Sequence, residues 1–278
     1  MKTLLRTAIL LLALIGVGFT ATVKAEVRVP SGSNVRGDFN FDSHPDYVLF
    51  NPAHRATAIW LMLGNAFQSS VDGPTLPSGW SLSTVTVANG DPAFVLTKET
   101  TRQTAIWKQG QVVVDRVFGP TLPPGWTLVA AVDFDNNGGF DYILFNPSTR
   151  QTAIWYLTGT TRTGQDFGPV LPSGWVLSDV ANFDDDLLPE LLISNPSTGR
   201  TAVWFFHNGI LMGGAYGPIM PSGWTLQGGT DINLDGQTDL VLSAVNTHQT
   251  AIWYMNGTTF SSGVLGPTTP ADYLLIFP

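Results

Sequence analysis

A unit of about 48 residues, present five times, constrains the fold more than any other feature of this chain. The string Thr-Ala-(Ile/Val)-Trp marks each copy, and successive tryptophans are 47, 48, 49 and 49 residues apart. These strand tryptophans are Trp60, Trp107, Trp155, Trp204 and Trp253. The string Gly-Pro-x-x-Pro-x-Gly-Trp follows the first four copies and ends at the Gly-Trp tryptophans, Trp80, Trp126, Trp175 and Trp224; in the fifth copy Tyr273 takes that place. A constant period of this length is typical of propellers and solenoids.

Within each copy the pattern is that of β-strands. Residues 141–145 (DYILF) form a short apolar run, and an NPST turn joins them to 152–157 (TAIWYL), so we expect a hairpin. Gly-Pro and Pro-Ser-Gly turns follow, and then a strand led by tryptophan, as in 126–132. No window shows sustained helical periodicity with caps.

The sequence therefore predicts an all-β fold, a five-bladed β-propeller built from repeats of about 48 residues. The expected repeats are 37–84, 85–132, 133–181, 182–230 and 231–278, within a single domain spanning 26–278. An open solenoid is the alternative, although solenoids need distinct capping repeats. Either terminus could supply the strand that completes the ring.

The N-terminus reads as a targeting signal. Lys2 and Arg6 precede an apolar run over 8–19, and Val23 and Ala25 suit a cleavage site, which predicts a signal peptide over 1–25. An uncleaved membrane anchor is the alternative, but the run is short for a bilayer, and no later segment is apolar enough to insert. We expect a secreted protein, extracellular or periplasmic.

Composition excludes several classes of protein. Hydrophobic residues make up 44% of the chain and charged residues 12%, which is ample for a core and argues against disorder. The formal net charge of −8 argues against nucleic acid as a partner. The absence of cysteine excludes thiol catalysis and cysteine-ligated zinc. An exported chain without disulfides must be held by its core, by metal, or by both.

Oxygen-bearing side chains at alternate positions precede the first strand of four repeats. They occupy positions one, three, five and nine of a nine-residue loop. The sets are Asp38, Asn40, Asp42 and Asp46; Asp133, Asp135, Asn137 and Asp141; Asn182, Asp184, Asp186 and Glu190; and Asp231, Asn233, Asp235 and Asp239. In the second repeat the same positions hold Val85, Val87, Asn89 and Ala93.

This spacing is what a hard cation such as Ca²⁺ requires, because the chain wraps the ion with oxygen ligands. Gly138 and Gly236, at position six, permit the sharp turn. Three carboxylates in one loop repel one another without a counter-ion. The alternative is a set of Asp/Asn-rich turns bonded to their own backbone. Four loops in register favour calcium as the cofactor, with these sixteen residues as its ligands.

The loops carry a resemblance to the FG-GAP and VCBS-type repeat families, whose propeller blades hold D-x-(D/N)-x-D-G-x-x-D calcium loops, as integrin α-subunit propellers do. DINLDGQTD (231–239) matches that pattern fully and DFDNNGGFD (133–141) nearly so, whereas DFNFDSHPD (38–46) and NFDDDLLPE (182–190) lack the glycine. TAIWYMNG (250–257) is similar to the second strand of bacterial secreted VCBS repeats. The resemblance covers 37–278 and implies a propeller with calcium loops. It implies no single activity, because these families include adhesins, lectin-like modules and accessory domains of enzymes.

We interpret the chain as a non-catalytic binding or adhesion module, with a glycan or a cell-surface protein as its partner. No residues stand out as catalytic, because most carboxylates belong to the repeated loops and nothing marks an acid/base pair or a triad. Trp80, Trp126, Trp175 and Trp224 are the candidate ligand-binding residues, since aromatic rings beside tight turns suit sugar stacking. Packing between blades is their alternative role, and the strand tryptophans are expected in the core. A protein-adhesion scaffold and a glycoside hydrolase are the alternative functions, and the sequence leaves the oligomeric state open.

Overall fold

The computed structural model describes residues 36–88, 91–109, 113–184, 186, 188–207 and 210–277. Contacts divide the chain into two units, Met1–Pro30 and Ser31–Pro278, and every described residue belongs to the second. The predicted signal peptide lies outside the described residues. Within the described part of the chain, no helix has the length and hydrophobicity needed to cross a membrane.

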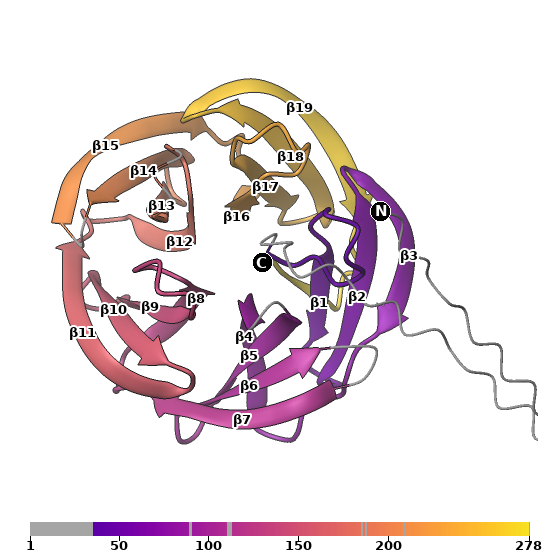
Figure 1. The fold of residues 1–278 in the computed structure, drawn as a ribbon. Coiled ribbons are helices and arrows are strands. Elements are labelled where there is room, and N and C mark those ends of the chain that lie inside the picture. The colour runs from indigo at the N-terminus through magenta and orange to yellow at the C-terminus, as the bar shows by residue number, and fades with distance from the viewer. Residues whose placement is uncertain are drawn as a thin grey trace, which may run out of the picture. The chain divides into compact units, whose positions relative to one another are not determined.

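The second unit is built from strands. They are β1 (Tyr47–Asn51), β2 (Ala56–Leu63), β3 (Ala66–Asp72), β4 (Trp80–Ala88), β5 (Asp91–Lys98), β6 (Gln103–Gln109), β7 (Val113–Thr121), β8 (Thr127–Val132), β9 (Asp141–Asn146), β10 (Gln151–Thr158), β11 (Thr161–Val170), β12 (Val176–Ala181), β13 (Glu190–Asn195), β14 (Arg200–His207), β15 (Ile210–Ile219), β16 (Trp224–Thr230), β17 (Asp239–Ala244), β18 (Gln249–Asn256), β19 (Thr259–Thr268) and β20 (Leu274–Ile276). They form five antiparallel four-stranded sheets around a ring, which confirms the predicted five-bladed β-propeller (Figure 1).

We number the sheets as blades in chain order. From the inside outward, blade 1 is β20-β1-β2-β3, blade 2 β4 to β7, blade 3 β8 to β11, blade 4 β12 to β15 and blade 5 β16 to β19. Each innermost strand of blades 2 to 5 is the tryptophan-led strand that ends one sequence repeat, and the other three strands come from the next repeat. Sheet and repeat are therefore offset by one strand, so consecutive repeats are linked by backbone hydrogen bonds within a blade.

The C-terminal strand completes blade 1. β20 pairs with β1 in the register Val48↔Ile276, Leu49↔Leu275 and Phe50↔Leu274. The ring of Phe277 then meets Tyr47 edge-on, with centroids 5.8 Å apart. This answers the question that the sequence left open, since the end of the chain supplies the missing inner strand.

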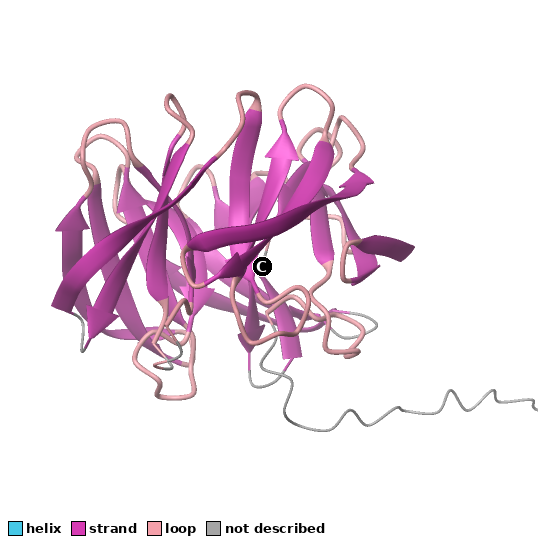
Figure 2. Ribbon diagram, turned by 90° about the horizontal axis from the view of Figure 1, so that it is seen from above, coloured by secondary structure: helices cyan, strands magenta, loops and turns pink. Residues whose placement is uncertain are grey.

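The core lies between neighbouring blades, because both faces of each inner sheet are covered. One cluster joins Ile143 and Ile154 of blade 3 to Leu191 and Ile193 of blade 4, and equivalent clusters occur between other neighbours. β1, β9 and β13 are buried along nearly their whole length. These strands accordingly read as continuous apolar runs rather than alternating ones. The connecting loops lie at the two ends of the strands (Figure 2).

In every repeat the Gly-Pro pair accepts a hydrogen bond from the third strand of the blade, counted from the inside, and so holds the outermost strand against it. In blade 3 the hydroxyl of Thr152 donates to the carbonyl of Pro169 at 2.8 Å, and a Cβ on Gly168 would lie 2.4 Å from the Thr152 Oγ1. Thr57, Thr104, Thr201 and Thr250 make the same bond to the proline of their own repeats. In each repeat the threonine of the Thr-Ala-(Ile/Val)-Trp string thus packs directly against the glycine of the Gly-Pro pair.

We expect Gly168→Ala to destabilise the protein by about 1–3 kcal/mol, because the added methyl must push aside a hydrogen-bonded hydroxyl and its strand. Gly213→Ala is the matched control, since Gly213 lies on the outer strand of blade 4 with open space around its Cβ position. Urea unfolding followed by tryptophan fluorescence measures both variants. Equal stability of the two variants would contradict the steric explanation.

Candidate functional site

The four acidic loops lie at one end of the blades. In blades 3, 4 and 5 each loop joins the innermost strand to the next strand, and position nine is the first residue of that next strand. In blade 1 the loop runs directly into β1, with Asp46 preceding Tyr47. The structure thus places every loop at the same entrance to its blade, as the register predicts.

The carboxylate at position nine ties the loop to two strands. Asp141 accepts the backbone N–H of Phe134 at 3.1 Å with Oδ2 and that of Leu157 on β10 at 2.8 Å with Oδ1. Asp46 and Asp239 make the same pair of bonds in blades 1 and 5. All of these carboxylates are fully buried. Position nine therefore fixes the loop even before any ion is considered.

The carboxylate at position one closes the turn. Asp133 accepts the N–H groups of Asn137 and Gly138, at 3.0 and 2.8 Å, so the loop curls around its oxygens. Asp38 and Asp231 accept the backbone N–H groups at the same two loop positions, five and six, in blades 1 and 5. Gly138 and Gly236 have φ of 87°, and Ser43, at the same position in blade 1, has φ of 73°. The first loop thus keeps the turn without glycine, at the cost of backbone strain.

Side-chain oxygens converge in two loops. One carboxylate oxygen from each of Asp133, Asp135 and Asp141 lies within 4.8 Å of the others, and Asp184, Asp186 and Glu190 converge in the same way. In the loop of blade 4, Glu190 accepts the N–H of Phe183 at 2.7 Å with Oε2, while its buried Oε1 has no hydrogen-bond partner among the described residues. In blade 5, the amide of Asn233 donates to Asp235 at 2.9 Å, and Asn40 donates to Asp42 in blade 1. In these two loops the asparagine amide therefore bonds the neighbouring carboxylate at position five.

Burial raises the pKa of the position-nine carboxyl in every loop. The pKa rises to about 7 for Asp46, to about 6 for Asp141 and Asp239, and to about 8 for Glu190. Desolvation is the largest cause, backbone N–H donors oppose it, and the neighbouring loop carboxylates raise the pKa further. Ionisation of a carboxyl in this buried setting costs free energy, and a bound cation would offset that cost.

Blade 2 has no such loop. β4 and β5 pair as far as Ala88↔Asp91, so a tight hairpin replaces the nine-residue turn. Val85 and Ala93 are fully buried at the positions that hold ligand residues elsewhere, and Asn89 lies outside the described residues. The described positions Val85, Val87 and Ala93 therefore offer no side-chain oxygen where the other loops have ligand residues.

The Gly-Trp tryptophans are half-buried and lie across the face of their blade. In blades 2, 3 and 4 each indole meets an aromatic ring from the outermost strand. That ring belongs to the residue before Gly-Pro and is largely exposed: Phe118 69%, Phe167 66% and Tyr216 71%. The ring centroids are 6.1 Å apart in the pair Trp80–Phe118 and 6.2 Å apart in the pairs Trp126–Phe167 and Trp175–Tyr216. Sequence reasoning missed these partners, although an aromatic residue before Gly-Pro recurs in three repeats.

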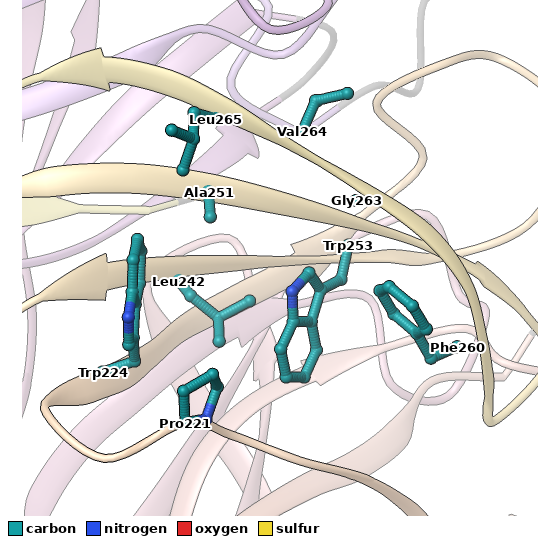
Figure 3. A pocket seen from close by; sticks show the side chains of 9 residues that line it. All are labelled: Pro221, Trp224, Leu242, Ala251, Trp253, Phe260, Gly263, Val264 and Leu265. Carbon is teal, nitrogen blue, oxygen red and sulfur yellow. The ribbon is translucent and has the colours of Figure 1, made fainter.

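Blade 5 has an open groove at the same place. Its volume is about 310 Å³, and it lies on the face of blade 5 that packs against blade 4. The indoles of Trp224 and Trp253 stand on either side of Leu242, with Ala251 between the strands behind and Pro221 below (Figure 3). Leu265 replaces the aromatic partner of the other blades. The groove therefore presents two indoles to one space.

The inner strand of blade 4 carries an unrepeated buried carboxylate. Asp179 pairs with Arg36 at 3.1 Å and accepts the N–H of Gly229 on β16 at 3.0 Å. Arg36 also donates to the carbonyl of Val180. Burial raises the pKa of Asp179, and the Arg36 guanidinium opposes that rise. This carboxylate is engaged in holding the ring together across blades 1, 4 and 5.

The comparisons with known proteins bear on the fold alone. No family model and no curated protein matches the chain. A protein of unknown function from Bacteroides caccae is similar at 12% identity and TM-score 0.45, over 79% of this chain and 73% of that one. The β-propeller domain of Cps50 (Swd1) from Myceliophteria thermophila matches at 11% identity and TM-score 0.41, over 80% and 86%. A chain of the Photorhabdus luminescens Tc holotoxin pore matches at 17% identity and TM-score 0.40, over 77% of this chain but 11% of its own length.

Proposed function

We propose that the protein is a secreted, calcium-stabilised binding module that recognises glycans in the grooves on the faces of its blades. The observation that carries the proposal is the groove of blade 5, where Trp224 and Trp253 face one space. Indole faces suit the C–H faces of sugar rings, and the indole N–H supplies a hydrogen-bond donor at the rim. Repetition of the tryptophans in several blades would let one molecule engage a glycan chain at more than one point.

The acidic loops support calcium as the resident cation. Buried carboxylates with raised pKa, oxygens converging within 4.8 Å and the orphaned Glu190 Oε1 all fit a hard divalent ion. The residues that would hold it are those at positions one, three, five and nine of the four loops. The ion would neutralise the loop charge and pin each inner strand to its neighbour. Extracellular modules commonly bind calcium at 10⁻⁴–10⁻³ M, a range that suits export directed by residues 1–25.

A glycan array, probed with the labelled protein in calcium and again with chelator, tests the proposed function. We expect binding in calcium, and we expect Trp224→Ala to weaken it at least about tenfold, because truncation of a central tryptophan anchor commonly costs ~2 kcal/mol or more. Tyr273→Ala is the matched control, since Tyr273 holds the same sequence position in the blade that lacks a Gly-Trp tryptophan.

If the protein binds no glycan on the array, either in calcium or in chelator, glycan recognition is overturned and a protein-adhesion scaffold is favoured. The exposed apolar side chains Ile210 and Met212, on the outer strand of blade 4, would then be the first surface to mutate.

A further inference from the structure

The acidic loop of blade 4 differs from the other three at position nine. In blades 1, 3 and 5 an aspartate stands there, and its Oδ1 accepts a backbone N–H from the third strand of the blade. Glu190 makes the loop bond, from the N–H of Phe183 to Oε2. Its Oε1 has no hydrogen-bond partner among the described residues, although the side chain is 0% exposed. A buried oxygen without a donor costs free energy, and a cation is one group that can satisfy it.

Two further carboxylates of this loop lie close to Glu190. One oxygen from each of Asp184, Asp186 and Glu190 lies within 4.8 Å of the others. In blades 1 and 5, position three is an asparagine whose amide donates to the carboxylate at position five. Asp184 takes position three in blade 4, and an ionised carboxylate has no proton to donate. The blade 4 loop therefore brings three acceptors together, an arrangement that a cation stabilises.

A histidine distinguishes blade 4 from blade 3, where three carboxylates converge in the same way. His207 is the last residue of β14, and its Nδ1 lies 3.9 Å from Oδ2 of Asp186. The equivalent strands of blades 1, 3 and 5 end at Leu63, Thr158 and Asn256. The imidazole is 63% exposed, so it can turn toward the loop without disturbing the core. At 3.9 Å the pair is too long for a hydrogen bond, which leaves the ring nitrogen able to act as a ligand.

Nitrogen among the ligands changes which ion the site prefers. Ca²⁺ is bound by oxygen, whereas imidazole is a preferred ligand of Zn²⁺, which also accepts carboxylates. Zn²⁺ takes four ligands at ~2.0–2.2 Å, so two ligand atoms on one ion are at most ~4.4 Å apart. The 3.9 Å between Asp186 and His207 lies within that limit. Oxygens 4.8 Å apart would have to close by roughly half an ångström, a shift open to the exposed side chains of Asp184 and Asp186.

We propose that the blade 4 loop is a mixed nitrogen–oxygen site that takes a transition-metal ion such as Zn²⁺ in preference to Ca²⁺, with Asp184, Asp186, Glu190 and His207 as its ligands. This inference rests on the proposed function, because it treats the acidic loops as cation sites. When calcium is the only ion offered, the same oxygens hold calcium as the other loops do. Because His207 belongs to the third strand, the ion makes the link from loop to third strand that the position-nine aspartates make by hydrogen bonds in the other blades.

Titration of the full, tag-free chain with Co²⁺ tests the inference, because Co²⁺ binds nitrogen–oxygen sites and is visible by its absorption. The protein is first stripped with chelator, and excess calcium then fills the oxygen loops. We expect one equivalent of Co²⁺ to bind despite the calcium, and Zn²⁺ to displace it. His207→Ala should weaken this binding at least about tenfold, since loss of even a supporting group commonly costs ~10–100-fold in metal affinity. The same variant should leave the calcium-dependent rise of the melting midpoint unchanged.

His54→Ala is the matched control for the loss of a histidine. His54 is exposed in the turn between β1 and β2, at the end of blade 1 opposite its acidic loop. A second pair of variants locates the ion. Asp184→Asn should weaken Co²⁺ binding as His207→Ala does, whereas Asp135→Asn, at the same position of the blade 3 loop, should leave it unchanged.

The possible failures are distinct. If neither Co²⁺ nor Zn²⁺ binds while calcium still raises the melting midpoint, the calcium loops stand and the mixed site is overturned. If no ion changes the midpoint, the calcium proposal is overturned with it. Unchanged Co²⁺ affinity in His207→Ala, equal losses from Asp184→Asn and Asp135→Asn, or more than one equivalent bound would each overturn the assignment to blade 4. Melts of every variant in chelator separate a lost site from a lost fold.

Discussion

We expect chelation of calcium to lower the melting midpoint of the protein by about 20 °C or more at pH 8 and by far less at pH 5. An ion that binds only the folded state at 100 times its dissociation constant adds ~2.7 kcal/mol, and four loops offer four such contributions. For a domain of this size each kcal/mol corresponds to ~2–4 °C. Loss of all four ions therefore changes stability by far more than an ordinary surface substitution does.

The pH dependence follows from the buried position-nine carboxyls. Without an ion, the pKa is about 7 for Asp46 and about 8 for Glu190, well above the ordinary values of these side chains. The folded state then holds protons more tightly than the unfolded state, so its stability is greatest below about pH 4 and falls as pH rises through 6 to 8. Each pKa unit corresponds to ~1.4 kcal/mol. Bound calcium would remove this loss because it would stabilise the ionised form.

Differential scanning calorimetry from pH 5 to pH 8, with calcium or with chelator, measures the effect. Asp135→Ala should reduce the calcium-dependent part by about one quarter, since it removes a ligand from one of four loops. Asp91→Asn is the control, because Asp91 is exposed in blade 2, which has no acidic loop. A midpoint that is indifferent to calcium at pH 8 would exclude metal from the loops and leave them as hydrogen-bonded turns.

We expect replacement of Arg36 by alanine to destabilise the protein by about 3–5 kcal/mol, because it leaves the carboxylate of Asp179 buried without its counter-charge. The side chains of Arg36 and Asp179 are 15% and 6% exposed, so water does not replace the lost partner. The variant should recover part of its stability as the pH is lowered, since Asp179 then becomes protonated and neutral. The wild type should show a smaller gain over the same range.

Guanidinium unfolding at pH 7.5 and pH 5 measures this effect. The double variant Arg36→Met with Asp179→Leu should regain most of the loss, since replacement of a buried pair by apolar residues is often neutral. Arg116→Ala controls for the loss of an arginine: Arg116 is exposed on an outer strand, and its contact over the Trp107 ring should be worth at most about 1 kcal/mol. A cost below about 1 kcal/mol for Arg36→Ala would show that Asp179 is neutral or hydrated in the wild type.

Much of the propeller ring could be predicted from the sequence, because nearby residues specify the turns and strands of each repeat and the same pattern recurs in every repeat. The expected hairpin of 141–145 with 152–157 appears as β9 and β10, which pair from Tyr142↔Trp155 to Asn146↔Gln151. The acidic positions fall at one end of the blades because they precede equivalent strands. Repetition made each weak local signal strong, since the same turn and strand pattern had to hold in every copy.

Contacts between residues that are far apart in the chain could not be predicted from the sequence. Nothing local links Arg36 to Asp179, which lies 143 residues further along the chain. Ser43 adopts the same left-handed backbone conformation as Gly138, and a serine at this position gives no sequence signal for that conformation. Bulges also shift the pairing within the outer hairpins, so that Trp107 is paired with Arg116 but Trp155 is paired with Gln165. Only the register of the folded sheet reveals it.

Pairing of β20 with β1 has a consequence for how the molecule is made. A chain synthesised from its N-terminus exposes one unpaired edge of the buried strand YVLFN until residues 274–276 emerge. Unpaired edges recruit other chains. Closing a loop of this length also makes the final step slow compared with the local hairpins. Until β20 pairs with β1, that edge is therefore open to other chains.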